Sequence, residues 1–332
     1  MIESIEFKNF KVLRNATLPL GKFTLIVGPN GSGKSTVFRA IDGLAGRYNA
    51  NYNSIISAGR FGSNSTLKAV CSDTGRCIYA QCSWQQDARI PVSIEELRPG
   101  LSEQRRKFAM CLNASRQYAL NPHAIAAHVS LRPEVELGSQ GNDLAGVLDR
   151  LRDSHPEQFD ALNRELGKWL PEFDQVLFET PSTGTRALLL RTRSGGHKIK
   201  AVDLSEGTLI ALAILTLAYL PKPPPLVCFE EPDHGLHPRL LRDVRDAIYR
   251  LAYPESFGEK RDPVQVIATT HNPYFLDLFR DHPEEIVIAE KNGLEATFSR
   301  LVDRTDLSEI LGDANLGEVW YSGVLGGVPA GT

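Results

Sequence analysis

The segment Gly28–Ser35, with the sequence GPNGSGKS, constrains the fold more than any other part of this 332-residue chain. It fits the pattern GxxxxGK[ST]. The apolar run Phe23–Val27 precedes it, and Lys34–Leu44 follows with helical spacing of apolar residues. A glycine-rich turn between a buried strand and a helix directs backbone N–H groups and the positive end of the helix dipole toward one point. The segment therefore predicts a phosphate-binding loop in an α/β fold.

This loop predicts roles for individual side chains. Lys34 is expected to reach the β- and γ-phosphates of a nucleotide and to act in their transfer, and the Ser35 hydroxyl is expected to ligate Mg²⁺. ATP and Mg²⁺ are thus the expected ligands. The predicted nucleotide-binding residues of the loop and of the helix start are Asn30, Gly31, Ser32, Gly33, Lys34, Ser35 and Thr36.

Leu226–Pro232, with the sequence LVCFEEP, reads as an apolar strand that ends in two carboxylates. Phosphoryl transfer depends on a metal ion and on a carboxylate that positions the attacking water. We expect Glu230 to belong to the Mg²⁺ shell, through a water because its side chain is longer than that of Asp. Glu231 is expected to lie against the attacking water and to be catalytic. An exposed strand edge is the alternative interpretation, which the phosphate-binding loop in the same chain disfavours.

Two further segments look ordinary when each is taken alone. Ser205, in LSEGT, precedes the largely apolar helix predicted over Ser205–Tyr219 and is suited to be its N-cap. His271 follows the apolar, β-branched run Val264–Thr270, which is typical of a central parallel strand.

The order of these motifs resembles the ABC-type ATPases, and among them the RecF/SMC-like branch with its OLD-type relatives. The resemblance extends from Ile2 to about Leu294 and rests on FKNFKVLRN, GPNGSGKS, LSEGT, EEPDHGLHP and TTHNP. It implies an α/β fold of the P-loop NTPase class with an ABC-type ATPase head. Such a head has a central, mostly parallel sheet, an antiparallel β subdomain and a short helical lobe.

The resemblance also implies that two copies of the chain close around ATP. Ser205 and Gly207 of one subunit would contact the γ-phosphate held by the other subunit, so that ATP binding forms a homodimer. His271 would hydrogen-bond the γ-phosphate and act in catalysis. His234 and His237, in DHGLHP, match the dimer-contact loop of the family.

Two residues are assigned by the same resemblance without a distinctive local motif. Gln117, in ASRQYALNP, is expected to be the lobe-switch glutamine near the metal, with Gln85 and Gln86 as the alternatives. Arg60, in SAGRFGS, is expected to be the arginine that reaches the nucleotide after the first helix.

The coarse pattern predicts three consecutive segments. Residues 1–94 would form the first part of the head, 95–203 an inserted helical and β lobe, and 204–332 the remainder of the head. Helices are expected between Pro122 and Phe173, with Pro156 separating two of them. Further strands are predicted at 2–7, 15–20, 66–71, 76–84, 107–113, 175–179, 186–192 and 197–202.

Because the lobe is short and no nuclease domain is expected after the head, a separately encoded effector such as a nuclease is the expected partner, by analogy. A net charge of −3 gives no general support for nucleic-acid binding. The basic stretch Arg186–Lys200 leaves direct DNA binding open, although a solvated strand face is the alternative interpretation.

No apolar run approaches the roughly 20 residues of a membrane helix, and the five cysteines form no CxxC pair. A cytoplasmic location without a membrane partner is expected.

Three functions are therefore weighed. The leading hypothesis is a homodimerising ATPase that controls DNA processing or a defence effector. A nucleotide-binding subunit of a membrane transporter is the second, against which LSEGT replaces the usual LSGGQ and GLHP replaces the usual SALD-like loop. The third is a nucleotide-dependent binding module without catalysis. The intact catalytic set argues against it, namely Lys34, Ser35, Glu230, Glu231 and His271.

Overall fold

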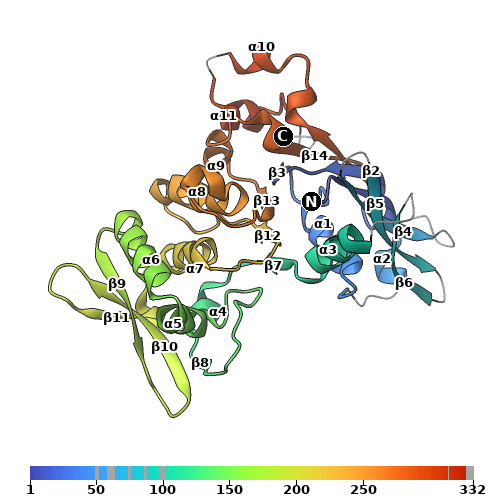
Figure 1. Cartoon of the computed structure of the whole chain (residues 1–332). Coiled ribbons are helices and arrows are strands. Elements are labelled where there is room, and N and C mark those ends of the chain that lie inside the picture. Colours follow the sequence, from blue (N-terminus) through green and yellow to red (C-terminus); the bar gives the residue numbers. More distant parts are fainter. Residues whose placement is uncertain are drawn as a thin grey trace. The chain divides into compact units, whose positions relative to one another are not determined.

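The structure is a computed structural model, which describes residues 1–48, 52–57, 64–73, 76–85, 88–96, 102–312 and 314–326 (Figure 1). Its contacts divide the chain into two units, each described below by itself. Unit 1 comprises Met1–Ser115, Pro224–Cys228 and Val264–Thr332, and unit 2 comprises Arg116–Pro223 and Phe229–Pro263. Both units draw on segments far apart in the sequence, so their limits differ from those of the three consecutive segments, which stay a prediction.

Unit 1 contains a mostly parallel sheet with the strand order β15-β14-β3-β13-β12. The strands β13 (Gln265–Thr270) and β14 (Ile286–Asn292) both run parallel to β3 (Phe23–Val27), whereas β15 (Glu295–Arg300) is antiparallel to β14. Every residue of β3 and β13 is buried, as expected for central strands covered on both faces. The predicted central parallel sheet is thus confirmed, with β12 (Leu226–Glu230) as the neighbour of β13.

Unit 1 also contains the predicted antiparallel sheet, in the order β2-β1-β4-β5-β6. Four of its strands were predicted, and the fifth, β6, was not. Inward-facing apolar residues alternate along β1, where Ile5 and Phe7 are fully buried. The strands are β1 (Ser4–Phe10), β2 (Leu13–Pro19), β4 (Ser65–Asp73), β5 (Arg76–Gln85) and β6 (Ala88–Glu96).

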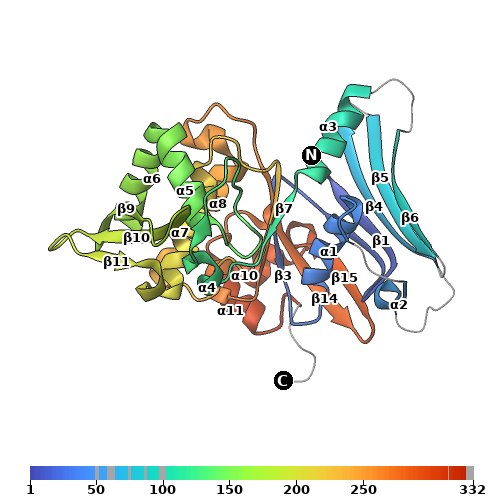
Figure 2. The ribbon, with the colours of Figure 1, turned by 90° about the horizontal axis from the view of Figure 1, so that it is seen from below.

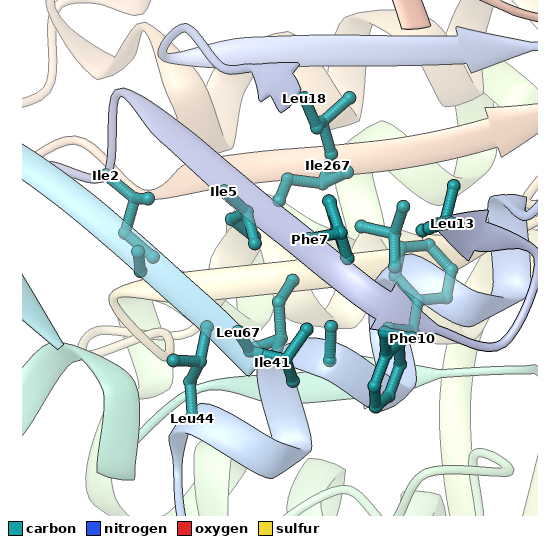
Figure 3. Close-up of a cluster of buried hydrophobic side chains, with 14 of the residues drawn as sticks. Ile2, Ile5, Phe7, Phe10, Leu13, Leu18, Ile41, Leu44, Leu67 and Ile267 are labelled. Atoms are coloured by element: carbon teal, nitrogen blue, oxygen red, sulfur yellow. The ribbon is translucent and has the colours of Figure 1, made fainter. Parts of the chain in front are cut away.

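Helix α1 (Lys34–Leu44) joins the two sheets of unit 1 through one buried cluster (Figure 3). Ile41 and Leu44 extend from the helix toward Leu67 of the antiparallel sheet, and Ile267 of β13 belongs to the same cluster. Each such side chain contributes about 1.5–3 kcal/mol when it leaves water. Apolar packing therefore fixes the helix that follows the glycine-rich loop. Figure 2 shows this helix beside the strands of unit 1.

A buried glutamine fastens the N-terminus of the chain to this core. The Gln265 Oε1 accepts from the backbone N–H of Ile2 at 2.9 Å, and its Nε2 donates to the carbonyls of Ile2 at 2.6 Å and of Gly21 at 2.9 Å. Each of these buried backbone groups would cost about 1–3 kcal/mol if it were left unpaired. The amide thus ties the segment before β1 and the turn before β3 to the first residue of β13.

The prediction of a strand at 107–113 is wrong, because this segment belongs to helix α3 (Ser102–Asn113). Phe108 and Leu112, four residues apart, are both buried, and Lys107 forms an i,i+4 ion pair of 3.0 Å with Glu103. A four-residue spacing places these pairs on one face of a helix, where they support each other. The remaining helices of unit 1 are α2 (Tyr52–Ile55), α9 (Pro273–Asp277), α10 (Leu307–Leu311) and α11 (Leu316–Tyr321).

Unit 2 contains a small antiparallel sheet in which β10 (Thr185–Thr192) pairs with the other three strands. Helices α5 (Leu144–Ser154) and α6 (Pro156–Trp169) lie against this sheet, at β10 and β9 respectively. Pro156 occupies the first turn of α6, which confirms the predicted break between two helices. The other strands are β7 (Arg116–Tyr118), which lies outside this sheet, and β8 (Val129–Ser130), β9 (Phe173–Glu179) and β11 (Lys198–Lys200).

Helix α7 (Glu206–Tyr219) forms the centre of unit 2. Its residues 207–219 are all buried, and it packs against α4 (Pro122–Ala126), α6 and α8 (Leu241–Ala252). A helix that is apolar on every side requires such complete coverage. Among the helices within the described ranges, none is long and apolar enough to cross a membrane.

Candidate nucleotide site

The glycine-rich loop connects β3 to α1, and its backbone adopts conformations that suit glycine. Gly31 has φ 78° and Gly33 has φ 93°, both in the left-handed region that side chains with a Cβ rarely enter. Gly33 is the N-cap of α1, and within the described residues no side chain caps this helix and no acidic residue lies in its first turn. The N–H groups and dipole of α1 are therefore available to an anion.

Packing around the loop leaves little room for other residues. A β-carbon at Gly28 would collide with the carbonyl oxygen of Ala289 on β14 and would lie 2.9 Å from the Ser32 hydroxyl. A β-carbon at Gly33 would lie 3.1 Å from Leu13 Cδ2 and 3.2 Å from Val12 Cγ2. The loop is thus held between β14 and the turn from β1 to β2, which preorganises its shape.

The polar side chains of the loop fit a polyanion. Lys34 is only 7% exposed, and its ammonium donates to the carbonyls of Gly28 at 2.6 Å and of Pro29 at 3.0 Å. Ser32 is fully buried, and among the described residues its hydroxyl has no hydrogen-bond partner. A buried ammonium and an unsatisfied hydroxyl inside a loop of N–H donors are what a bound phosphate chain would satisfy.

The other predicted loop residues lie at the surface. Asn30, Gly31 and Ser35 are exposed, and Thr36 is half-buried. Their backbone or hydroxyl groups are therefore accessible to a ligand from solvent.

His271 follows a strand that ends level with the start of this loop. In the parallel pairing of β13 with β3, Thr270 lies opposite Val27, so His271 and Gly28 leave neighbouring strands at the same edge. The Asn272 side chain caps α9 by accepting from Tyr274 N–H at 3.0 Å, and this fixes the chain direction directly after His271. His271 itself is exposed to solvent. The structure thus brings His271 and the loop to one edge of the sheet.

The two acids lie at the end of β12, and the second has an unusual backbone. Glu230 is the last residue of the strand, and Glu231 has φ 47°, in the left-handed region. Its carbonyl accepts from His234 N–H at 3.0 Å, which starts a tight turn that continues through Gly235 at φ 70°. A non-glycine residue held in this way costs about 1–3 kcal/mol, and such strain is typical of functional sites. The sequence carries no signal for it.

The left-handed backbone of Glu231 predicts the relative stability of two variants. Both Glu231→Ala and Glu231→Gly remove the carboxylate, but only glycine adopts φ 47° without strain. Glu231→Gly should therefore be more stable than Glu231→Ala by about 1 kcal/mol, the reverse of the order at a relaxed strand position. Urea unfolding of both variants measures the difference. A more stable alanine variant would show that the residue is not strained.

The predicted signature residues have different surroundings. Ser205 is exposed and caps α7, its hydroxyl accepting from Thr208 N–H at 3.2 Å. Gly207 is buried, and a β-carbon there would lie 2.9 Å from the carbonyl oxygen of Gly235. Gly207 therefore lets α7 pack closely on the turn after β12, a packing role that the sequence did not indicate. Its contact with phosphate stays a prediction.

The remaining predicted residues are placed as follows. Gln117 is the middle residue of β7 and is half-buried, and its metal role stays a prediction. Gln85 ends β5 and is exposed, whereas Gln86 and Arg60 lie outside the described residues. His237 has a local role, because its Nδ1 accepts from Arg239 N–H at 3.2 Å and caps a short 3-10 turn.

Most cations of the basic stretch in unit 2 are engaged within the protein. Arg186 pairs with Asp149 at 2.9 Å and Arg191 with Asp174 at 2.8 Å. The hydrogen bond from Arg191 lowers the pKa of Asp174, so this carboxylate stays charged. Further along, Lys200 pairs with Glu179 at 3.0 Å, and Arg193 donates to the carbonyl of Pro171 at 2.9 Å. Three of these cations thus face carboxylates and the fourth is held by a backbone carbonyl, which favours the interpretation as an ordinary strand surface.

Comparisons with known proteins agree with this geometry. The Thermus scotoductus protein named "OLD nuclease" is 25% identical over 372 aligned positions, which cover 96% of this chain and 68% of that protein. An SMC head solved in complex with the C-terminal winged-helix domain of ScpA shares 17% identity at a TM-score of 0.64, covering 90% of this chain and 97% of the other. The SMC head domain from Thermotoga maritima shares 18% identity at a TM-score of 0.53, covering 90% of this chain and 98% of the other.

Two family models match the chain in succession. The model described as "AAA ATPase domain" matches residues 1–87. Residues 93–277, more than half of the chain, match the AAA_21 model, an AAA domain whose description also names the AbiEii toxin and a Type IV TA system. Together with the fold, these matches confirm the resemblance to OLD-related, SMC/RecF-like ABC-type ATPases. The chain belongs to the AAA_21 family of AAA-domain proteins.

Proposed function

We propose that this chain binds ATP with Mg²⁺, dimerises around it and hydrolyses it to ADP and phosphate. The observation that carries the proposal is the loop Gly28–Ser35, whose left-handed glycines, buried Lys34 ammonium and uncapped helix α1 converge on one anion-binding position. Membership of an AAA-domain family supports nucleotide as the anion.

The oxygen donors predicted for the metal suit Mg²⁺. Ser35 offers a hydroxyl and Glu230 a carboxylate, and hard oxygen ligands of this kind are what Mg²⁺ takes beside phosphate oxygens. The bound ion would neutralise the charge that develops on the phosphates during transfer. Lys34 and the loop N–H groups hold the β- and γ-phosphates in place.

Glu231 and His271 supply the remaining chemistry in this proposal. The Glu231 carboxylate orients the attacking water and accepts its proton, and the left-handed backbone at φ 47° fixes its direction. His271 donates a hydrogen bond to the γ-phosphate, from the end of a strand in register with β3.

Dimerisation completes the site in this proposal. Ser205, exposed at the start of α7, would contact the γ-phosphate bound by the other subunit and add the dipole of its helix. Closure would then control a protein partner, for which a separately encoded effector such as a nuclease, acting in DNA processing or defence, is the leading candidate. The name of the OLD nuclease relative and the ScpA-bound SMC head support a role of this kind by analogy.

The test measures both the rate of ATP hydrolysis and the molecular mass of the protein in solution. Purified protein should release phosphate from ATP with Mg²⁺ but not with EDTA, and Glu231→Gln should lower the rate about 100-fold or more. Light scattering should show that Glu231→Gln doubles its mass with ATP and not with ADP. Glu172→Gln, at an exposed site, is the matched control and should behave like the unchanged protein. A Glu231→Gln variant that stays monomeric with ATP would remove the dimer mechanism.

A further inference from the structure

A second lysine lies beside the glycine-rich loop, contributed by β14. In the parallel pairing of β14 with β3, Ile288 lies opposite Val27, so β14 continues past the end of β3 along the loop. Lys291 lies three residues beyond Ile288, and a β-carbon at Gly31 would lie only 3.5 Å from its Nζ. The ammonium thus lies against the loop at Gly31.

The backbone that carries Lys291 is fixed to the same support as the loop. Lys291 pairs with Ala296 in the hairpin of β14 and β15, and the N–H of Ala296 donates to the carbonyl of Val12 at 2.9 Å. The Val12 side chain in turn limits the space at Gly33. The backbone of Lys291 and the loop are therefore held by the same segment of the β1–β2 turn, so binding a ligand there orders the lysine side chain but requires no rearrangement of the backbone.

The charge of Lys291 is not used inside the protein. Lys291 is exposed, and within the described residues its ammonium makes no hydrogen bond or ion pair, in contrast to the buried Lys34. The neighbouring acid does not neutralise it, because the Glu290 carboxylate lies against Gly326, on the other side of the strand. An uncompensated positive charge remains next to exposed loop residues Asn30 and Gly31.

We propose that Lys291 is a further nucleotide-binding residue, which contacts the phosphate oxygens of ATP from the solvent side of the loop while Lys34 contacts them from within. This inference rests on the proposed function, since the ligand is the same ATP. A lysine ammonium suits this position because it is a point charge on a flexible stem and needs no fixed bidentate geometry.

The experiment measures the equilibrium dissociation constant of Mg²⁺-ATP by isothermal titration calorimetry. Lys291→Gln should weaken binding about tenfold, as expected for one hydrogen bond to a charged group, and the loss should shrink at high salt because the site is exposed. Lys291→Arg should restore affinity to within about threefold, because it keeps the charge. Lys260→Gln, which removes an exposed lysine elsewhere in the chain, is the matched control and should not change affinity.

The outcomes separate this inference from the proposed function. If Lys291→Gln binds ATP as Lys260→Gln does, while Lys34→Ala has lost binding, Lys291 has no role and the proposed function stands. If the unchanged protein does not bind ATP, both are overturned. Thermal unfolding of Lys291→Gln without nucleotide should match that of the unchanged protein, and a large loss of stability would point to a structural role instead.

Discussion

Replacing Lys34 by alanine is expected to weaken ATP binding by about 100-fold or more and to abolish hydrolysis. Lys34 is 7% exposed, and its ammonium lies inside the loop, where it donates to the carbonyls of Gly28 and Pro29. Each charge-assisted hydrogen bond to phosphate is worth about 1.5–3 kcal/mol, and the γ-phosphate and β-phosphate each offer acceptors. Calorimetric titration with Mg²⁺-ATP measures the loss directly.

The control for Lys34→Ala must separate lost binding from lost folding. The variant also leaves the two loop carbonyls without their donor, so we expect it to be less stable by about 1–2 kcal/mol without nucleotide. Urea unfolding measures this loss of stability, and Lys260→Ala gives the baseline for replacing an exposed lysine. A folded Lys34→Ala protein that keeps ATP affinity within a few-fold would contradict a phosphate site in this loop.

Features set by local sequence could be predicted. The loop at Gly28–Ser35 lies between β3 and α1 as expected, because an apolar run, a glycine-rich turn and a helical spacing each act over a few residues. The buried strand β13 before His271 was predicted for the same reason, from its uniform run of apolar and β-branched residues. Ser205 as an N-cap also follows from local chemistry.

Features set by distant contacts could not be predicted. Gly207 is required because the carbonyl of Gly235 approaches it, and Lys291 comes close to Gly31 only through the register of β14 on β3. Glu231 adopts a left-handed backbone although its residue type gives no indication of one. The prediction of a strand at 107–113 was wrong because the short apolar run of this segment also fits a strand, while the ion pair that marks the helix begins earlier, at Glu103.

Part of the candidate site is built within a single unit. The loop, His271 and Lys291 all belong to unit 1, on three parallel strands whose registers place Val27 opposite both Thr270 and Ile288. Neighbouring carboxyl ends of parallel strands are where α/β folds bind ligands. The roles of Glu230, Glu231 and Ser205 rest instead on the motif order and stay proposals.

Replacing Ser205 by arginine is expected to leave ATP binding intact, prevent ATP-dependent dimerisation and lower hydrolysis about 100-fold. Ser205 is exposed at the start of α7, so the chain can fold with an arginine at this position. The arginine side chain would project into the surface that is proposed to receive the second subunit. The variant loses a cap, at about 1 kcal/mol, and adds a positive charge at the positive end of the helix dipole. Light scattering with ATP in the Glu231→Gln background measures dimerisation.

Ser205→Ala is the matched control, because it removes the same cap without adding bulk or charge and should still dimerise in part. Mixing the Lys34→Ala and Ser205→Arg proteins gives a sharper test. If the signature acts on the other subunit, a mixed dimer contains one intact site, formed by Lys34 of one copy and Ser205 of the other. Only one of its two sites faces the arginine, whereas both do in a Ser205→Arg homodimer, so part of the dimerisation and of the activity should return. A mixture as inactive as the separate variants, or equal loss of ATP binding in both, would contradict a site shared between two subunits.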